Sequence, residues 1–207
     1  MNKLHMKKII SLLTIIISGL SFAQVTFNPG IRAGANFSHF TNNSSQSYYY
    51  WDYDYYPSGT NPTMDFKTKT DFYIGLFGNI RFAKFYALQP EINYSRQGTK
   101  LDTNINNWNG QTLTATYVGV QLVNKFYFNK FNVHFGPTLD FLVEQKNFDA
   151  ENEVDLGITA GLGFDITKNF GVEARVKKGF VPVYYFNGDH SNVTFQAGVY
   201  YTFNMKK

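Results

Sequence analysis

Residues Val154–Ile166 alternate between apolar side chains and aspartate, threonine or glycine without a break. Successive side chains of a β-strand point to opposite faces, so this pattern predicts a strand with one apolar face. A tilted strand of about 9–11 residues is enough to cross a bilayer. The run is therefore long enough to be a membrane-spanning strand.

Eight segments show this alternation, and an even number of strands can close a sheet and remove its edges. Their connections are unequal, with short ones after the second, fourth and sixth segments and long ones between, above all Thr41–Lys69. Short periplasmic turns and long extracellular loops are typical of outer-membrane barrels. We expect an all-β, eight-stranded antiparallel up-and-down transmembrane β-barrel, with a bulge or distorted pair at Pro90. The eight segments are Gly30–Phe40, Thr70–Phe82, Tyr86–Gly98, Leu113–Phe128, Asn132–Lys146, Val154–Ile166, Phe170–Gly179 and Asn192–Phe203.

The N-terminus has the organisation of a secretory signal. Three lysines precede the apolar run Ile9–Leu20, and the small-residue site Ser21–Ala23 follows. The apolar run is too short for a membrane-spanning helix, which needs roughly 20 residues. We therefore expect residues 1–23 to be cleaved and residues 24–207 to form the barrel domain in the outer membrane of a Gram-negative bacterium.

The composition agrees with such a barrel and excludes several other classes. Of 207 residues, 18% are aromatic, 17 are glycine and none is cysteine. Without cysteine there are no disulfides, thiolate metal sites or cysteine nucleophiles. The signal holds three of the 19 basic residues and no acidic residue, which leaves 16 bases against 15 acids. This balance, with no basic cluster, does not indicate nucleic-acid binding.

Alternation alone leaves open which face points inward, because a soluble eight-stranded barrel of the lipocalin kind would bury the apolar face. Three features favour the membrane arrangement: glycines crowd the polar face, aromatic residues gather at strand ends, and acids and bases alternate on the polar face. An unpaired charge in a narrow lumen would be costly, so we expect ion pairs there. The predicted lumen charge network comprises Arg32, Asp71, Arg81, Glu91, Asp140, Glu144, Asp155, Asp165, Glu173, Arg175 and Lys177.

Several stretches resemble the small outer-membrane β-barrel family often labelled "porin family" or PorT-type. They are Pro29–Ser38, Leu88–Gly98, Phe135–Pro137, Glu173–Arg175 and Ala197–Phe203. The family commonly has Glu-Ile-Pro where this chain has Gly119-Val120-Gln121. The resemblance implies an outer-membrane barrel but no reaction, because members of one fold differ in function.

The first long loop contains an unusual aromatic and acidic run. One interpretation is an adhesive or glycan-binding surface, in which aromatic faces stack on sugar rings and the aspartates accept hydroxyl groups or bind Ca²⁺. The alternative is a loop that folds over the barrel mouth or extends the aromatic girdle. The run consists of Tyr48, Tyr49, Tyr50, Trp51, Asp52, Tyr53, Asp54, Tyr55 and Tyr56.

Candidates for chemistry are weak. Asp189, His190 and Ser191, in the last long loop, invite a comparison with lipid deacylases. Adjacent strand residues point to opposite faces and would not form a nucleophile–base pair, although a loop could relax this geometry. His39 and His134 have no spaced partners, so we expect no metal, no cofactor and no catalytic residue.

Eight strands enclose little more than side chains. We therefore expect a non-enzymatic barrel with a mostly filled lumen, acting through its extracellular loops or a membrane partner. The alternatives are a narrow porin-like channel for small solutes and, third, a lipid-modifying enzyme. The expected partners are outer-membrane lipid and either another envelope protein or a surface glycan.

Overall fold

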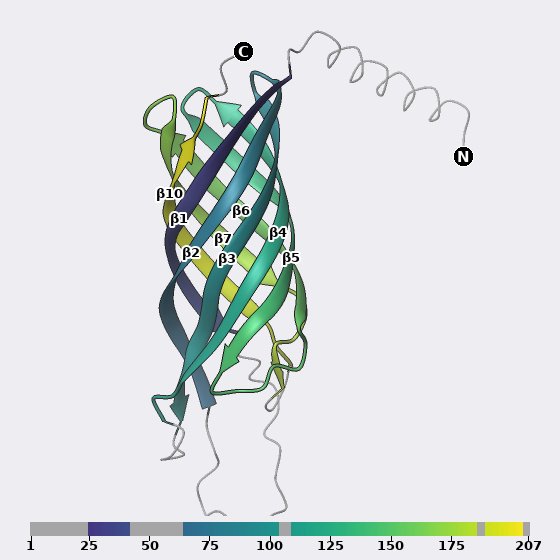
Figure 1. Ribbon diagram of the computed structural model, residues 1–207. Coiled ribbons are helices and arrows are strands. Elements are labelled where there is room, and N and C mark those ends of the chain that lie inside the picture. The colour runs from purple at the N-terminus through teal and green to yellow at the C-terminus, as the bar shows by residue number, and fades with distance from the viewer. Residues whose placement is uncertain (1–24, 42–63, 104–108, 186–188, 205–207) are drawn as a thin grey trace, which may run out of the picture.

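Eight long strands close into one antiparallel barrel in the computed structural model (Figure 1). The structure describes residues 25–41, 64–103, 109–185 and 189–204. Around the ring the order is β1-β10-β7-β6-β5-β4-β3-β2, so each strand pairs with its sequence neighbours and β10 closes onto β1. The barrel strands are β1 (Thr26–Phe40), β2 (Met64–Ala83), β3 (Tyr86–Thr103), β4 (Thr112–Phe128), β5 (Phe131–Lys146), β6 (Val154–Asp165), β7 (Phe170–Gly179) and β10 (Asn192–Thr202).

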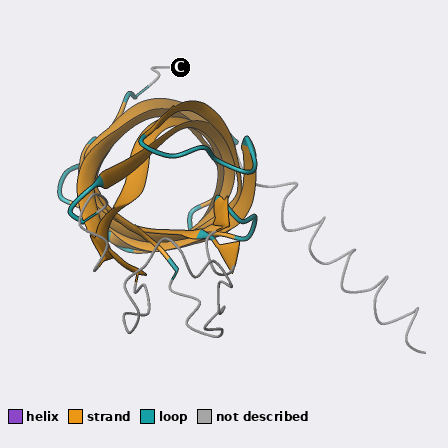
Figure 2. Ribbon diagram, turned by 90° about the horizontal axis from the view of Figure 1, so that it is seen from below, coloured by secondary structure: helices purple, strands orange, loops and turns teal. Residues whose placement is uncertain are grey.

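The predicted fold class is confirmed. Turns 84–85, 129–130 and 166–169 meet at one end, and the longer connections lie at the other. Figure 2, viewed from the end with the long connections, shows the strands as a closed ring. Among the described residues, no helix is long and apolar enough to cross a membrane.

The polar face points inward, as the membrane arrangement requires. Ile74 and Leu76 on the outer wall are 54% and 62% exposed, whereas Glu91 and Arg175 inside are 2% and 1% exposed. A soluble barrel would have the reverse arrangement, and that alternative is therefore excluded. Glycine makes room for the charged lumen: a Cβ atom on Gly119 would overlap the Asp140 carboxylate.

Three strand ends were predicted too short. β1 begins at Thr26, β2 begins at Met64 and β3 continues to Thr103. β2 and β3 pair from Met64↔Thr103 to Thr68↔Thr99, and a register shift follows between Thr68 and Tyr73. This extension lies beyond the apolar outer belt, so its sequence carries charged residues and lacks the membrane alternation. The other barrel strand ends differ from the prediction by one residue at most.

Two local features interrupt the regular strand pattern. Pro90 was predicted to lie at a bulge or distorted pair, and the β2–β3 pairing has a gap there without a bulge, because Phe77↔Glu91 and Ile80↔Leu88 keep one register on either side. A small hairpin, β8 (Tyr184–Tyr185) with β9 (Asp189–His190), was not predicted, since two-residue strands carry no periodic signal.

The outer wall provides a direct test of membrane placement. Leu76→Arg should lower the free energy of unfolding in lipid vesicles by about 2–4 kcal/mol if the residue faces the bilayer centre. Leu76→Ala is the matched control and should cost less, because it removes apolar contact without placing a charge in lipid. Urea titration followed by tryptophan fluorescence measures both, and equal costs for the two variants would contradict a lipid-facing position.

Candidate functional site

Four charged side chains fill the middle of the lumen. The Glu91 carboxylate on β3 accepts two hydrogen bonds from Arg175, from Nη1 to Oε2 and from Nη2 to Oε1, each at 2.9 Å. Its Oε2 also accepts a hydrogen bond from Arg32 Nη1 at 2.5 Å. Arg175 Nη2 also donates to Glu173 Oε2 at 2.9 Å. Arg32 Nη2 lies 2.7 Å from Glu173 Oε1 as an ion pair without hydrogen-bond geometry. All four side chains are at most 1% exposed, and their two positive and two negative charges balance. We call Arg32, Glu91, Glu173 and Arg175 the central ion cluster.

Tyr73 completes the central ion cluster from β2. The Arg32 guanidinium lies 4.7 Å from the centroid of the Tyr73 ring, and the Tyr73 hydroxyl donates to Glu173 Oε1 at 3.3 Å. Within the cluster, the two parallel hydrogen bonds between Arg175 and Glu91 are the strong, bidentate form of an arginine–carboxylate ion pair. Buried charges need such pairing, because removal of one partner leaves the other without compensation.

Uncharged polar side chains form a second layer between the central ion cluster and the outer mouth. Gln97 Oε1 accepts hydrogen bonds from Asn192 Nδ2 at 2.6 Å and Thr194 Oγ1 at 2.9 Å, and Gln97 Nε2 donates to Ser95 Oγ at 2.9 Å. Asn36 joins the layer through Ser95, at 2.9 Å. These hydrogen bonds join β3 to β1 and β10, which are not its neighbours in the sheet, so the side chains of this layer lie within the lumen.

An apolar cluster lies at the outer mouth. It consists of the inward-facing, buried residues Phe40, Phe66, Leu101, Leu113 and Val183, with Phe148 and Ala150 packed against them. The Phe40 ring meets Phe66 and Phe148 edge-on, at centroid distances of 5.8 and 5.9 Å. The polar inward face of the membrane segment thus becomes apolar beyond the membrane. We call this group the mouth cluster.

The segment that brings Val183 over the mouth is held by hydrogen bonds at several points. Val183 N donates to His190 O at 2.8 Å within the β8–β9 hairpin. Asn152 Nδ2 donates to Pro182 O at 2.9 Å, and Val181 N donates to Asp155 Oδ1 at 3.1 Å. Asp155 therefore anchors this segment to the barrel rim.

The other predicted lumen charges lie in separate groups at different depths. Lys177 pairs with Asp140 at 2.8 Å, and Asp71 pairs with Lys69. Near the short turns, the Arg81 guanidinium lies 3.8 Å from the centroid of the Tyr127 ring, and Asp165 accepts a hydrogen bond from Tyr200. The eleven predicted residues are therefore not one continuous network.

Glu144 lies outside the lumen. Its side chain is exposed at the outer rim, where it accepts a hydrogen bond of 3.4 Å from Thr116 Oγ1. The register shift of the β4–β5 ladder next to Thr116 changes the alternation there, so inward and outward positions could not be counted from the sequence.

On the same exposed rim, the hydrogen bond and charge of Asp102 raise the pKa of Lys67.

The histidines have different surroundings. His134 is buried in the lumen, with Nδ1 3.0 Å from Asn132 Oδ1. His190 Nδ1 lies 2.5 Å from the Thr41 carbonyl oxygen, whereas the neighbouring Ser191 Oγ accepts a hydrogen bond of 2.5 Å from Lys178 Nζ. In the described ranges, no group of three or more histidine, cysteine or acidic residues could hold a metal ion.

The Tyr48–Tyr56 run lies outside the described residues, as does the predicted signal segment. Two features were missed by sequence reasoning, namely the Gln97 layer and the mouth cluster. Gln97 stands in an alternating strand, so a search for all inward polar residues would have found it. The mouth cluster offered no such signal, because its apolar residues occupy positions where a polar face was expected.

An eight-stranded transmembrane β-barrel with buried, paired charges in its lumen is the class that this fold and site define. Residues 22–185 match the family described as "Outer membrane protein beta-barrel domain". The chain belongs to this family, and its barrel therefore belongs to the outer membrane. No curated protein matches the chain.

Three solved structures with similar folds are distant from this chain in sequence. Neisserial surface protein A is 13% identical, with a TM-score of 0.50, and the match covers 84% of this chain and 97% of that one. OprG from Pseudomonas aeruginosa is 12% identical, with a TM-score of 0.47 and coverage of 88% and 99%. Ail, the attachment invasion locus protein of Yersinia pestis, is 16% identical, with a TM-score of 0.45 and coverage of 85% and 98%. Sequence identities this low indicate a similar fold and nothing about function.

Removal of one acid should disrupt the central ion cluster. Glu91→Ala leaves Arg32 and Arg175 without their shared partner and should lower the free energy of unfolding by about 3–5 kcal/mol. Glu91→Leu combined with Arg175→Met should restore part of this loss, since Arg32 then retains Glu173. Urea unfolding in vesicles measures both variants, with the exposed Glu153→Ala as a control expected to cause no measurable change. A Glu91→Ala variant as stable as the control would show that these ion pairs do not hold the lumen together.

Proposed function

We propose that this chain is a closed, non-enzymatic outer-membrane barrel that acts by binding a partner at its extracellular end. The observation that carries the proposal is the filled lumen. The central ion cluster, the Gln97 layer and the mouth cluster lie in succession along the barrel and leave its outer end as the surface for function. A narrow channel for small solutes is the competing function.

The outer end has features of a presented surface. β2 and β3 continue beyond the apolar belt as a paired extension, and hydrogen bonds hold the β8–β9 hairpin and the preceding Val183 at this end. The connection between β1 and β2 leaves and returns at this end, and its sequence contains Tyr48–Tyr56. We propose this run as the surface that binds a glycan or another envelope protein, because aromatic side chains provide large contact areas at little entropic cost.

Two finer assignments complete the proposal. The stretches Pro29–Ser38 and Leu88–Gly98 support a PorT-type member of the family. The lysines and apolar run before Ala23 support export through a cleaved signal peptide.

Planar-bilayer recording separates the closed barrel from the channel. We expect no stable conductance steps from the full-length mature protein, because ions find no continuous aqueous path through paired, buried charges. A Glu91→Ala, Arg175→Ala double variant should show more conductance events than the parent if the central ion cluster is what blocks the path. Steady conductance steps from the parent protein would contradict a closed barrel and support the channel.

Whole cells test the binding surface. Cells that display the protein should bind glycan-coated beads, or retain a crosslinked envelope protein, and a variant lacking Tyr48–Tyr56 should lose this binding while keeping its surface level. A variant with Tyr and Trp in this run replaced by Ser is the length-matched control for loop deletion and should behave in the same way. Binding unchanged in both variants would exclude this run as the surface.

A further inference from the structure

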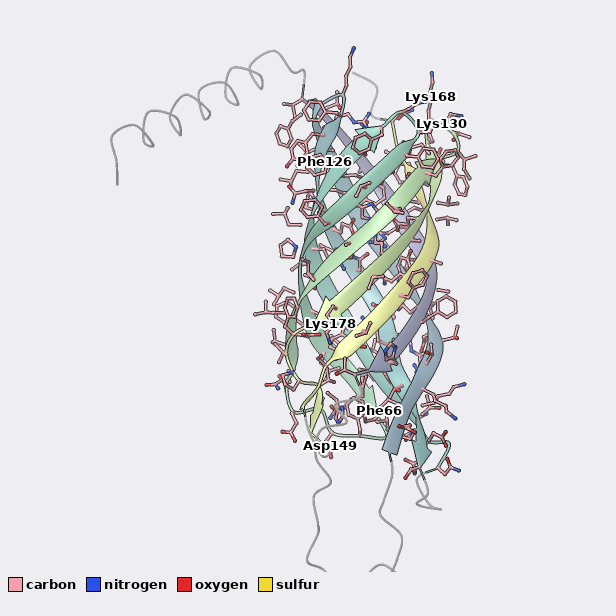
Figure 3. The ribbon with its side chains drawn as sticks, turned by 180° about the vertical axis from the view of Figure 1, so that it is seen from behind. Phe66, Phe126, Lys130, Asp149, Lys168 and Lys178 are labelled. Atoms are coloured by element: carbon pink, nitrogen blue, oxygen red, sulfur yellow. The ribbon has the colours of Figure 1, made fainter. Side chains whose placement is uncertain are left out.

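All three short turns at the periplasmic end carry an exposed lysine. These are Lys84 between β2 and β3, Lys130 between β4 and β5, and Lys168 between β6 and β7. Lys130 and Lys168 project at one end of the barrel in Figure 3, opposite the end where Phe66 and Asp149 lie. In the described part of the chain, none of the three lysines forms an ion pair.

The charge at this end is strongly one-sided. Within the three turns and the three residues on either side of each, the charged residues are the three lysines, Arg81 and Asp165. Asp165 is bound to Tyr200 and Arg81 stacks on Tyr127, so both are engaged within the barrel. The opposite end is mixed in sign, since the connection 147–153 holds Asp149, Glu151 and Glu153 while Lys67, Lys100 and Lys146 are exposed on the strands at that end. The turn lysines thus give the periplasmic rim an uncompensated positive charge.

Aromatic rings fix the depth of these lysines in the membrane. Phe85 lies in the first turn, Phe128 and Phe131 flank the second, and each of the three is 63% exposed. Phe82, Tyr86 and Phe126 continue the row, with ring centroids 6.1 and 5.2 Å apart. Such aromatic girdles lie at the membrane–water interface. Lys84 and Lys130 each lie next to one of these rings along the chain, and Lys168 lies two residues from Phe170, which is 36% exposed. The three ammonium groups therefore lie at the level of the phospholipid headgroups.

We infer that the three turn lysines, Lys84, Lys130 and Lys168, form a ring that binds anionic phospholipid headgroups of the periplasmic leaflet. A lysine close to an anionic membrane surface contributes about 1 kcal/mol of attraction. The adjacent phenylalanines supply the contact with the upper part of the acyl chains. This interaction concerns the end of the barrel opposite to the proposed partner-binding surface and does not depend on it.

The test compares lipid preference in the full-length mature protein. The protein is reconstituted in vesicles of phosphatidylcholine mixed with phosphatidylglycerol, and spin-labelled lipids report the relative association constant of each headgroup. We expect the parent to prefer phosphatidylglycerol, by up to about fivefold for each lysine that contacts a headgroup. The variant Lys84→Gln, Lys130→Gln, Lys168→Gln should show a preference close to one.

A matched variant controls for net charge. Lys67→Gln, Lys100→Gln, Lys146→Gln removes three exposed lysines from the opposite end, and it should keep the parental preference. Higher salt should weaken the preference of the parent, because exposed charges are screened. If the turn variant does not fold, as judged by its heat-dependent gel mobility, this salt series on the parent serves as the test. No preference in the parent, an equal loss in the two variants, or no response to salt would each overturn the inference.

Discussion

Charge pairing inside a very narrow barrel is the constraint on which this structure depends. Eight strands leave an interior that side chains alone can fill, and the outer wall must be apolar because it faces lipid. All the polarity of the membrane segment is therefore directed inward. Arg175 can be tolerated there because Glu91 and Glu173 both reach it, and because Arg32 offsets the second acid.

The same constraint explains the glycines and the change of chemistry along the barrel. A Cβ atom at Gly161 would overlap both His134 and Arg175, so this position must stay small for the long side chains around it. Beyond the membrane the outer wall no longer has to be apolar, and the inward positions are free to take apolar residues. Phe40 and Phe66 use that freedom to build the mouth cluster. The outer end of the barrel thus contains apolar packing, and its middle contains ion pairs.

The sequence predicted the membrane part of this structure better than its ends. Alternation located Val154 and Phe170 as strand starts because lipid demands an apolar residue at every second position. That demand stops at the rim, so the start of β2 at Met64 was missed. Alternation also predicted which charged residues face the lumen, but it did not predict which of them form ion pairs with one another. Glu91 lies 59 residues from Arg32 and 84 from Arg175, and only the stagger of the closed barrel brings them together.

Access of a polar reagent to the lumen tests the filled barrel most directly. The chain has no cysteine, so a single Ser95→Cys variant reports on one buried position in the Gln97 layer of the lumen. A charged methanethiosulfonate reagent, added from either side of the membrane, should leave Cys at this position unmodified while an exposed Glu153→Cys variant reacts readily. Modification of both variants at similar rates would show an open aqueous lumen and contradict the account.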